Sequence, residues 1–328
     1  MTVRVGFLST AHMHAHGYAH ALRQRPDASI VGVWDSVTER AATFAQRWEI
    51  PVFEEPDRLL SQCDAVIVTS ENRKHAEHVA WAADAGKAIL CEKPVATSVA
   101  DGASIREAVE KANVLFMTSF PCRLSPVYQS FRAKISEGAI GDVLAIWGTN
   151  HGTCPFDWFV QREQSGGGAF MDHVVHVADL FGNLFGALPK AVYAQSNHRR
   201  LGLEVEDTAF LHLTFPDGVF ATLDASWSRP KYYKTWGDVR LSATGSKGVL
   251  EADLFQQALD LYADEPPTHR EVGYGSNLDT LLVDAFLSSV IKETEPPITL
   301  DDGLAASAVA LAAVESAQKA EPVAVTAL

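Results

Sequence analysis

Short apolar runs alternate with longer amphipathic stretches along the first third of the chain. The runs are rich in branched residues and end at small or polar residues, which is typical of strands buried on both faces of a parallel sheet. The stretches between them repeat their apolar positions with a helical period. The pattern predicts βαβ units, with strands at 3–8, 29–34, 65–69, 88–91 and 114–117 and helices at 14–24, 38–48, 74–84 and 98–111.

From about residue 143 the pattern changes to one strand after another. In the stretch 208–215 apolar and polar residues alternate, which predicts a strand with one wet or covered face. The Pro-Asp-Gly sequence that follows Phe215 predicts a hairpin turn. One large, mostly antiparallel sheet is expected, with further strands at 143–150, 191–196, 219–227, 239–244, 248–252 and 257–262 and helices at 126–137, 278–292 and 301–319.

Length and charge narrow the class of protein. A chain of 328 residues is too long for one ordinary core and predicts two domains. It carries 27 Lys and Arg against 41 Asp and Glu, a net charge of −14, which argues against a nucleic-acid or anionic-membrane partner. The four cysteines are scattered without a CxxC pair, and no apolar run reaches about 18 residues. We expect a cytoplasmic protein with reduced thiols and no membrane segment.

The stretch 166–179 begins with three glycines and continues as a helix that is apolar almost all round, so the helix should be buried. Asp172, His176 and Asp179 lie at i, i+4 and i+7, within about 60° of one stripe. Such a stripe is costly inside a protein unless its groups pair or do chemistry. A carboxylate one turn from an imidazole suits a general base, and a paired core Asp–His is the equal alternative. His173 lies off the stripe.

The carboxyl ends of the first strands are where a parallel sheet binds its ligand. There the first strand runs into a helix, whose N-terminus favours phosphate. The register expected for G-x-G-x-x-G falls on residues 9–14, where all three glycines are replaced: Ser9 and Ala11 are small, but His14 is not. Asp35 ends the second strand and favours NAD over NADP, because a carboxylate accepts ribose hydroxyls and repels a 2′-phosphate. The predicted cofactor-binding residues are Ser9, Thr10, Ala11, His12, Met13, Asp35, Ser70, Asn72, His75, Glu92 and Lys93.

Two further features of this edge carry candidate chemistry. His12, His14 and His16 alternate and, with His173 and His176, could form a metal site. The alternative, which we expect, is that they are polar residues near the cofactor phosphates, with no metal. Lys93 follows the strand 88–91 and precedes Pro94, so its ammonium should point into the ligand crevice and hold a substrate hydroxyl. A lysine simply exposed on a loop is the alternative.

Two segments carry a family resemblance: Ala-Gly-Lys-Ala-Ile-Leu-Cys-Glu-Lys-Pro at 85–94, and Gly-Gly-Gly-Ala-Phe-Met-Asp-His-Val-Val-His-Val-Ala-Asp-Leu at 166–180. Together they resemble the glucose–fructose oxidoreductase, inositol dehydrogenase and MocA (Gfo/Idh/MocA) family. The likeness covers nearly the whole chain, including the turn 123–126. It implies an α/β fold with an N-terminal NAD(P)-binding Rossmann domain, 1–122, and a C-terminal α+β domain, 123–328, with a large, mostly antiparallel open sheet and a last helix packing back on the first domain.

The resemblance also implies roles for site residues. Lys93 would bind the reacting hydroxyl beside the nicotinamide, His176 would accept its proton, and Asp172 would orient the sugar or the histidine. Glu71 departs from the family, which often has proline there, as do the missing glycines and His173. The expected substrate-binding residues are Arg123, His151, Trp158, Asp172, His173 and Trp236, with Arg162, Arg229 and Lys231 as further candidates.

These features together predict an NAD-dependent oxidoreductase that acts on a secondary hydroxyl of a sugar, polyol or glycoside. An NAD- and metal-assisted lyase or glycoside-cleaving enzyme, and a non-catalytic binding homologue, are the alternatives. Because one face of the large sheet must be covered, we expect a homodimer or homotetramer formed through that sheet.

Overall fold

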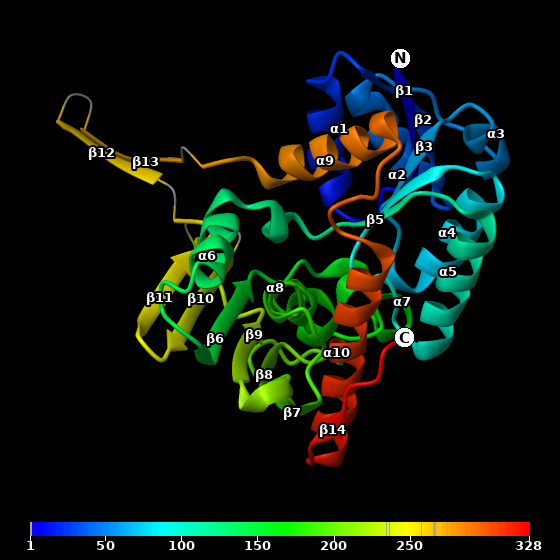
Figure 1. Ribbon diagram of the computed structural model, residues 1–328. Helices are drawn as coiled ribbons and strands as arrows, with labels where there is room; N and C mark the ends of the chain where they lie inside the picture. The colour runs from blue at the N-terminus through cyan, green and yellow to red at the C-terminus, as the bar shows by residue number, and fades with distance from the viewer. Residues whose placement is uncertain (1, 234, 236, 257, 265–266, 274) are drawn as a thin grey trace.

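The computed structural model describes residues 2–328 except 234, 236, 257, 265–266 and 274. Two sheets organise the chain, with helices packed around and between them (Figure 1). Trp236 and Gln257, the first residue of one expected strand, lie outside the described residues. None of the described helices is both long and apolar enough to cross a bilayer.

The first sheet is parallel throughout and has the strand order β2-β1-β3-β4-β5. The predicted alternation of strands and helices is confirmed, and one short helix, α3, was not expected. The chain crosses from one side of β1 to the other between β2 and β3, and ligands bind at such a switch point. Its elements are β1 Val3–Leu8, α1 His14–Arg23, β2 Ala28–Trp34, α2 Thr38–Trp48, α3 Pro56–Leu60, β3 Ala65–Val68, α4 His75–Asp84, β4 Ala88–Cys91, α5 Val99–Ala112 and β5 Phe116–Thr118.

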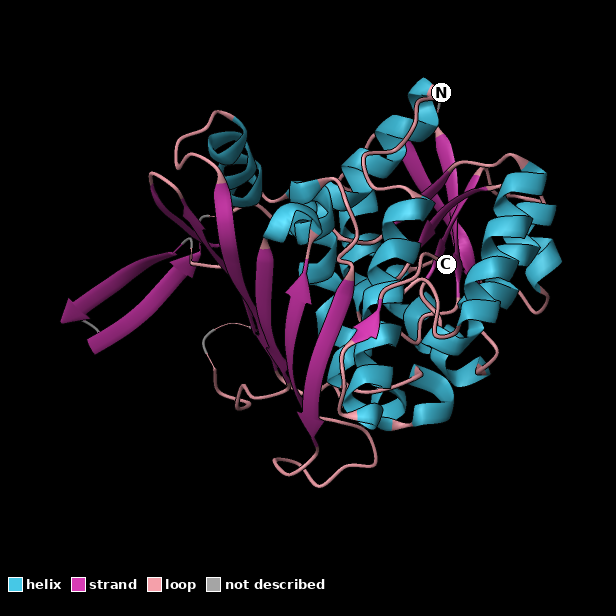
Figure 2. Cartoon of the chain, turned by 60° about the horizontal axis from the view of Figure 1, so that its bottom comes forward, coloured by secondary structure: helices cyan, strands magenta, loops and turns pink. Residues whose placement is uncertain are grey.

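The second sheet has seven strands in the order β11-β10-β6-β9-β8-β7-β14. The prediction of a mostly antiparallel sheet is confirmed, since β6 and β9 form its one parallel pair among the described strands. Helices cover one face of this sheet (Figure 2). Its strands are β6 Val143–Gly152, β7 Ala191–Asn197, β8 Thr208–Thr214, β9 Phe220–Ser226, β10 Gly237–Gly245, β11 Gly248–Asp253 and β14 Val323–Ala324.

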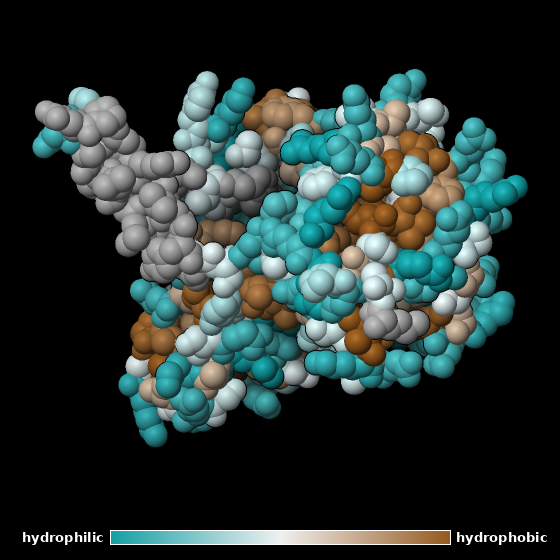
Figure 3. Space-filling view, turned by 90° about the horizontal axis from the view of Figure 1, so that it is seen from above, coloured by the Kyte–Doolittle hydropathy of each residue, from teal (hydrophilic) through white to brown (hydrophobic). Residues whose placement is uncertain are grey.

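The remaining elements link and flank the sheets. Strands β12 and β13 form a separate antiparallel hairpin that extends away from the body (Figure 1). Seen from above, polar side chains are interspersed with small apolar patches over the body of the molecule (Figure 3), as is usual for a protein surface. These elements are α6 Pro126–Ser136, α7 Arg162–Ser165, α8 Val175–Phe185, β12 Ala258–Asp264, β13 Pro267–Gly273, α9 Leu278–Lys292 and α10 Leu300–Lys319.

The core is continuous from one sheet to the other. Helix α9 packs on α1, and α10 packs along α8 and β7 and also reaches β5 and α5. Gly148 of β6 lets α8 approach closely, because a Cβ there would meet Val177 at 2.8 Å. One cluster of buried apolar side chains accordingly runs from β1 and α1 through α8 to the second sheet and α10.

The glycine loop before α8 is held in place by Glu206. Gly168 N and Phe170 N both donate to Glu206 Oε1, at 2.7 and 3.2 Å. A Cβ on Gly168 would lie 2.0 Å from the Glu206 carbonyl oxygen, a backbone atom that has little room to move. The chain then makes a π-helical turn, Phe170–Val174, before α8 begins, where the sequence predicted one regular α-helix.

Replacing Gly168 with alanine should therefore destabilise the protein by about 1–3 kcal/mol, the usual cost of forcing a methyl group into a closed contact. Gly182, within α8, is the matched control, because a Cβ there meets nothing within 4 Å. Gly182→Ala should raise stability by up to about 1 kcal/mol through helix propensity. Urea unfolding followed by circular dichroism measures both changes. Equal stability of Gly168→Ala and the unaltered protein would show that the close approach is not a constraint.

Candidate functional site

Two segments far apart in the chain meet at the carboxyl edge of the first sheet. Lys93, just after β4, is 2% exposed, and its Nζ lies 2.7 Å from Asp172 Oδ1. The same ammonium donates a hydrogen bond to the Asp172 carbonyl oxygen at 3.1 Å. The structure thus joins the lysine predicted at the sheet edge to the carboxylate predicted on the glycine-led helix.

The Asp172 carboxylate is held on both of its oxygens. Oδ2 accepts a hydrogen bond from Trp227 Nε1 at 2.8 Å and lies 3.2 Å from His173 Nε2. Burial alone would raise the pKa of Asp172, but Lys93 and His173 hold it well below its ordinary value. Asp172 is therefore a fixed anion. The sequence placed Trp227 at the end of an expected strand, 219–227, but gave no signal that its indole reaches this carboxylate.

The π-helical turn brings His173 into the site, although the α-helical stripe had excluded it. Its Nδ1 donates a hydrogen bond to the Asn150 carbonyl oxygen of β6 at 2.9 Å. A wider turn changes the direction in which successive side chains leave the helix, and such turns are frequent at functional sites. Asp179, the third member of the predicted stripe, instead pairs with Arg123, whose Nε lies 3.0 Å from Asp179 Oδ2.

His176 follows Asp172 by one turn and is 5% exposed. Its Nδ1 is buried and has no hydrogen-bond partner among the described residues. Burial, and next the charge of Lys93, hold the pKa of His176 well below its ordinary value. The ring is therefore neutral near pH 7 and able to accept a proton. Phe120 packs edge-on against it, with ring centroids 6.0 Å apart.

Glu92 is fully buried beside Lys93 and anchors the start of α1. The Tyr18 hydroxyl donates a hydrogen bond to Glu92 Oε1, and His14 Nδ1 lies 3.0 Å from the same oxygen. Burial would raise the pKa of Glu92, but His12, His14 and Lys93 hold it well below the ordinary value. Tyr18 was not identified from the sequence, because nothing in a helical pattern shows which buried tyrosine faces a carboxylate.

The histidines at the first turn do separate tasks. His12, His14 and Glu92 place one ligand atom each within 4.8 Å of one another, which is close enough for a metal ion. However, His12 Nδ1 accepts a hydrogen bond from His14 N at 3.2 Å, and burial lowers the pKa of His12 to about 3. The neutral ring then carries its proton on Nε2, so this nitrogen offers a donor rather than a lone pair. His16 accepts from Trp48 Nε1 at 3.0 Å, away from Glu92.

The first turn keeps its shape without glycine. Ser9 has φ +65°, a left-handed conformation that normally favours glycine. Its hydroxyl compensates by donating to Asp35 Oδ2 at 2.9 Å and accepting from Ala11 N at 3.3 Å. His14 occupies the third glycine position without wedging the helix off the sheet, because its side chain turns to Glu92.

Several buried polar atoms along this edge lack a partner in the described part of the chain. Nearly all such atoms are paired in folded proteins, so a group of them marks a place for a polar ligand. They come from the segment just after β3, the first turn and the start of α8, which is where a dinucleotide lies on this kind of sheet. The residues present thus fit a bound NAD. The atoms are His12 Nε2, Ser70 Oγ, Asn72 Oδ1 and His176 Nδ1.

Other predicted cofactor residues have internal partners here. His75 Nδ1 donates to the Pro94 carbonyl oxygen at 2.8 Å, and Asn72 Nδ2 donates to the Ser165 carbonyl oxygen at 2.9 Å. Asp35 lies where it was expected, at the end of β2, but its oxygens accept from Thr10 N and from Arg40. Met13, in the turn itself, is exposed.

The expected substrate residues are distributed over three places. Asp172 and His173 lie in the cluster around Lys93. Trp158 lies over the first turn, where its Nε1 donates to the Ala11 carbonyl oxygen at 3.0 Å. Arg123 is buried between Asp179 and Asp302, with its Nη1 2.8 Å from Asp302 Oδ2. Trp236 lies outside the described residues.

His151 lies on the same face of β6 as the exposed Trp147, since alternate residues of a strand share a face. Its ring nitrogens are each 3.1 Å from a carboxylate, of Asp224 and of Asp238. Burial lowers the pKa of His151, but these two carboxylates outweigh it and raise the pKa to about 9. Of the further candidates, Arg229 pairs with Asp238, Arg162 lies 3.7 Å from Glu206 Oε2, and Lys231 is exposed.

Comparison with known proteins agrees with this architecture. Residues 3–120 match the model of an oxidoreductase family with an NAD-binding Rossmann fold, and residues 128–251 match the C-terminal domain of the same Gfo/Idh/MocA family. An uncharacterised oxidoreductase of Streptococcus pneumoniae is 30% identical over 264 residues, which are 77% of this chain and 69% of that one. Inositol 2-dehydrogenase of Rhizobium meliloti is 27% identical over 334 residues, covering 96% of this chain and 97% of its own.

A solved structure extends the agreement to three dimensions. The crystal structure of a putative myo-inositol dehydrogenase from Sinorhizobium meliloti superposes with a TM-score of 0.83 at 26% identity, covering 99% of this chain and all of the other. The expected Rossmann sheet, antiparallel second sheet and NAD cofactor are thereby confirmed. The chain belongs to the Gfo/Idh/MocA family and is an NAD-binding oxidoreductase.

Proposed function

We propose that this enzyme transfers a hydride between NAD and a secondary hydroxyl of a sugar or polyol, with Lys93 and His176 at that hydroxyl. The observation that carries the proposal is the fixed ion pair of Lys93 with Asp172, 2.7 Å apart, together with the neutral imidazole of His176, whose Nδ1 has no partner among the residues that the structure describes. The inositol 2-dehydrogenase relative acts on a polyol, which supports this class of substrate.

Lys93 is suited to hold the hydroxyl. An ammonium has three N–H bonds, and two of them are directed at Asp172 Oδ1 and at its carbonyl oxygen. The third is then available to a substrate oxygen. Its positive charge stabilises negative charge that develops on this oxygen as the proton leaves, and a buried site strengthens that interaction. Trp227 keeps Asp172, and with it the lysine, in one orientation.

His176 is suited to take the proton. Burial and Lys93 keep the ring neutral, so the proton acceptor is present without prior deprotonation. Lys93 also opposes the charge that the ring gains, which helps to return the proton to substrate when the reaction runs in reverse. Bound NAD supplies the nicotinamide that accepts the hydride.

We also propose a division of labour along the chain. Residues 1–122 would bind the cofactor, and residues 123–328 would bind substrate and a partner subunit. Two observations support this: the family models match 3–120 and 128–251, and the site takes its lysine from the first part and its Asp172–His176 pair from the second.

We further propose that the enzyme works in the cytoplasm. Cys63, Cys91, Cys122 and Cys154 are free and buried. Burial raises the pKa of the Cys63 and Cys122 thiols to about 12, so both stay protonated and poorly reactive. Free thiols of this kind suit a reducing compartment.

The outer face of the second sheet supports a homodimer or homotetramer. Trp147, Phe210 and Phe220 lie on neighbouring strands β6, β8 and β9 and are 41%, 47% and 46% exposed. Large side chains left exposed together on a sheet face are typical of an interface. A second copy of the same face would bury them symmetrically.

Substituting Lys93 or His176 by alanine should lower turnover by at least about 100-fold, because each removes a group that stabilises or accepts charge at the reacting oxygen. NADH absorbance with a panel of inositols, aldoses and anhydrosugars measures the loss. Lys134→Ala, an exposed lysine of α6 paired with Glu137, is the control and should be fully active. A loss below tenfold for either site variant would remove its proposed role.

The pH profile of kcat/KM gives an independent check on His176. Burial and Lys93 depress the pKa of the ring, so the ring becomes protonated, and the enzyme loses its base, only at low pH. The acid limb should therefore lie below the ordinary imidazole value of about 6.5. An acid limb at or above that value would assign the base to another group.

Placing a charge on the outer sheet face should separate the subunits. Phe210→Asp would bury an unpaired carboxylate in the proposed interface, so it should give a monomer at micromolar concentration by light scattering. Val99→Asp, at an apolar residue of α5 that is even more exposed, at 66%, is the control and should leave the oligomer intact. A monomeric unaltered protein would contradict the proposal.

A further inference from the structure

The carboxylate expected to bind the adenosine ribose is already saturated. Asp35 Oδ2 accepts from Ser9 Oγ at 2.9 Å, Thr10 N at 2.7 Å and Arg40 Nε at 2.7 Å. Oδ1 accepts from Val37 N at 2.8 Å and Arg40 Nη2 at 2.6 Å. A carboxylate offers about four lone-pair directions, so five donors leave none for a ribose hydroxyl.

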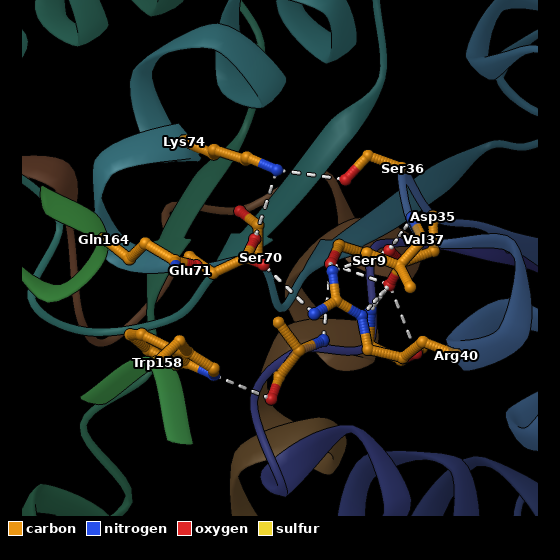
Figure 4. A network of polar contacts seen from close by, with 12 residues as sticks. Ser9, Asp35, Ser36, Val37, Arg40, Ser70, Glu71, Lys74, Trp158 and Gln164 are labelled. Carbon is orange, nitrogen blue, oxygen red and sulfur yellow. Dashed lines mark hydrogen bonds and ion pairs between the residues drawn. The ribbon is translucent and has the colours of Figure 1, made fainter. Parts of the chain in front are cut away.

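Arg40 is the donor that a ribose can replace. Thr10 N and Val37 N belong to the backbone that shapes the turn, whereas the guanidinium reaches Asp35 on a flexible side chain that is 23% exposed. Arg40 also has a second anchor: its Nη1 lies 3.0 Å from Glu71 Oε1 (Figure 4). When ribose hydroxyls take its place on Asp35, the guanidinium still has a carboxylate partner and is not left buried and unpaired.

Glu71 also engages a second cation. Lys74 Nζ lies 3.6 Å from Glu71 Oε2 and donates a hydrogen bond to Ser36 Oγ at 3.0 Å, just past the end of β2. Figure 4 shows Lys74 extending from the segment of Glu71 across to Ser36, and Arg40 lying on the side of Asp35. Glu71 is itself buried after β3. One carboxylate therefore engages two cations next to the ribose end of the site.

We propose that Glu71 sets the preference for NAD over NADP, by engaging Arg40 and Lys74 so that neither serves a 2′-phosphate. A 2′-phosphate brings a charge of about −1.5 to −2 next to Asp35 and Glu71. Arg40 and Lys74 are the side chains placed to offset it, and both are bound to Glu71. Asp35 alone would be a weaker barrier, because Arg40 cancels its charge. The inference rests on NAD binding at this edge and not on the identity of the substrate.

The test is a Glu71→Gln variant, which keeps the shape of the side chain and removes its charge. NAD, NADP and 2′,5′-ADP are titrated by calorimetry, which needs no turnover. Release of both cations should raise the affinity for NADP and for 2′,5′-ADP by at least about tenfold, which corresponds to about 1.4 kcal/mol. Affinity for NAD should stay the same or fall, because the ribose hydroxyls still have Asp35 but the displaced Arg40 no longer has a second carboxylate.

Two comparisons isolate the mechanism. Glu77→Gln removes the same charge from an exposed position on α4 and should leave both affinities unchanged. Adding Arg40→Ala to Glu71→Gln should cancel most of the gain for NADP, since the guanidinium is the nearer cation. Glu71→Ala provides the same comparison if the glutamine variant does not fold.

The outcomes separate this inference from the proposed function. If the unaltered protein binds NAD but the Glu71 variants gain less than threefold for NADP, Glu71 does not set the preference. A gain that survives loss of Arg40, or one that Glu77→Gln reproduces, also overturns it. Failure of the unaltered protein to bind NAD at all would instead count against the proposed function.

Discussion

The ion pair between Lys93 and Asp172 joins the two halves of the molecule at the point where chemistry is expected. Both groups are almost completely buried, so each depends on the other: removing either would leave a charge without a partner in a dry environment. The pair therefore fixes the separation of the first sheet from α8. The indole of Trp227 binds the anion of this pair, and the cation adds to burial in lowering the pKa of His176.

Two further carboxylates are held by partners within the protein, one at each end of the same crevice. Near Lys93, the Glu92 carboxylate is held by His14 and Tyr18. Near the start of α2, the Asp35 carboxylate is held by Arg40. The first group keeps the Glu92 carboxylate next to Lys93, and the second keeps the Arg40 guanidinium on Asp35, the carboxylate expected to bind the ribose. The edge of the sheet is thus charge-balanced in the free protein, and a ligand enters by exchanging partners rather than by meeting bare charges.

Much of the fold was predictable because it follows from local pattern. The five parallel strands, the hairpin after Phe215 and the two C-terminal helices are visible as apolar periods and turn residues. Lys93 and Asp172 could each be singled out as site residues, because a strand end and a glycine-led helix both mark ligand sites, but the ion pair between them was not predicted. The partners that complete the site could not, since Trp227, Tyr18 and Arg40 approach from elsewhere in the fold. The π-helical turn was also missed, because a 3.6-residue period assumes that the helix is regular.

The continuous core has a consequence for how the molecule moves. Because apolar side chains from both sheets belong to one cluster, a jaw-like opening of the two halves would expose that cluster to water. The segment that carries Trp158 adds to this rigidity over the first turn, where its indole donates a hydrogen bond to the Ala11 carbonyl oxygen and the rings of Trp158 and Phe159 pack against His12. The continuous core therefore favours a stiff body, in which the two sheets keep their relative positions when a ligand binds or leaves.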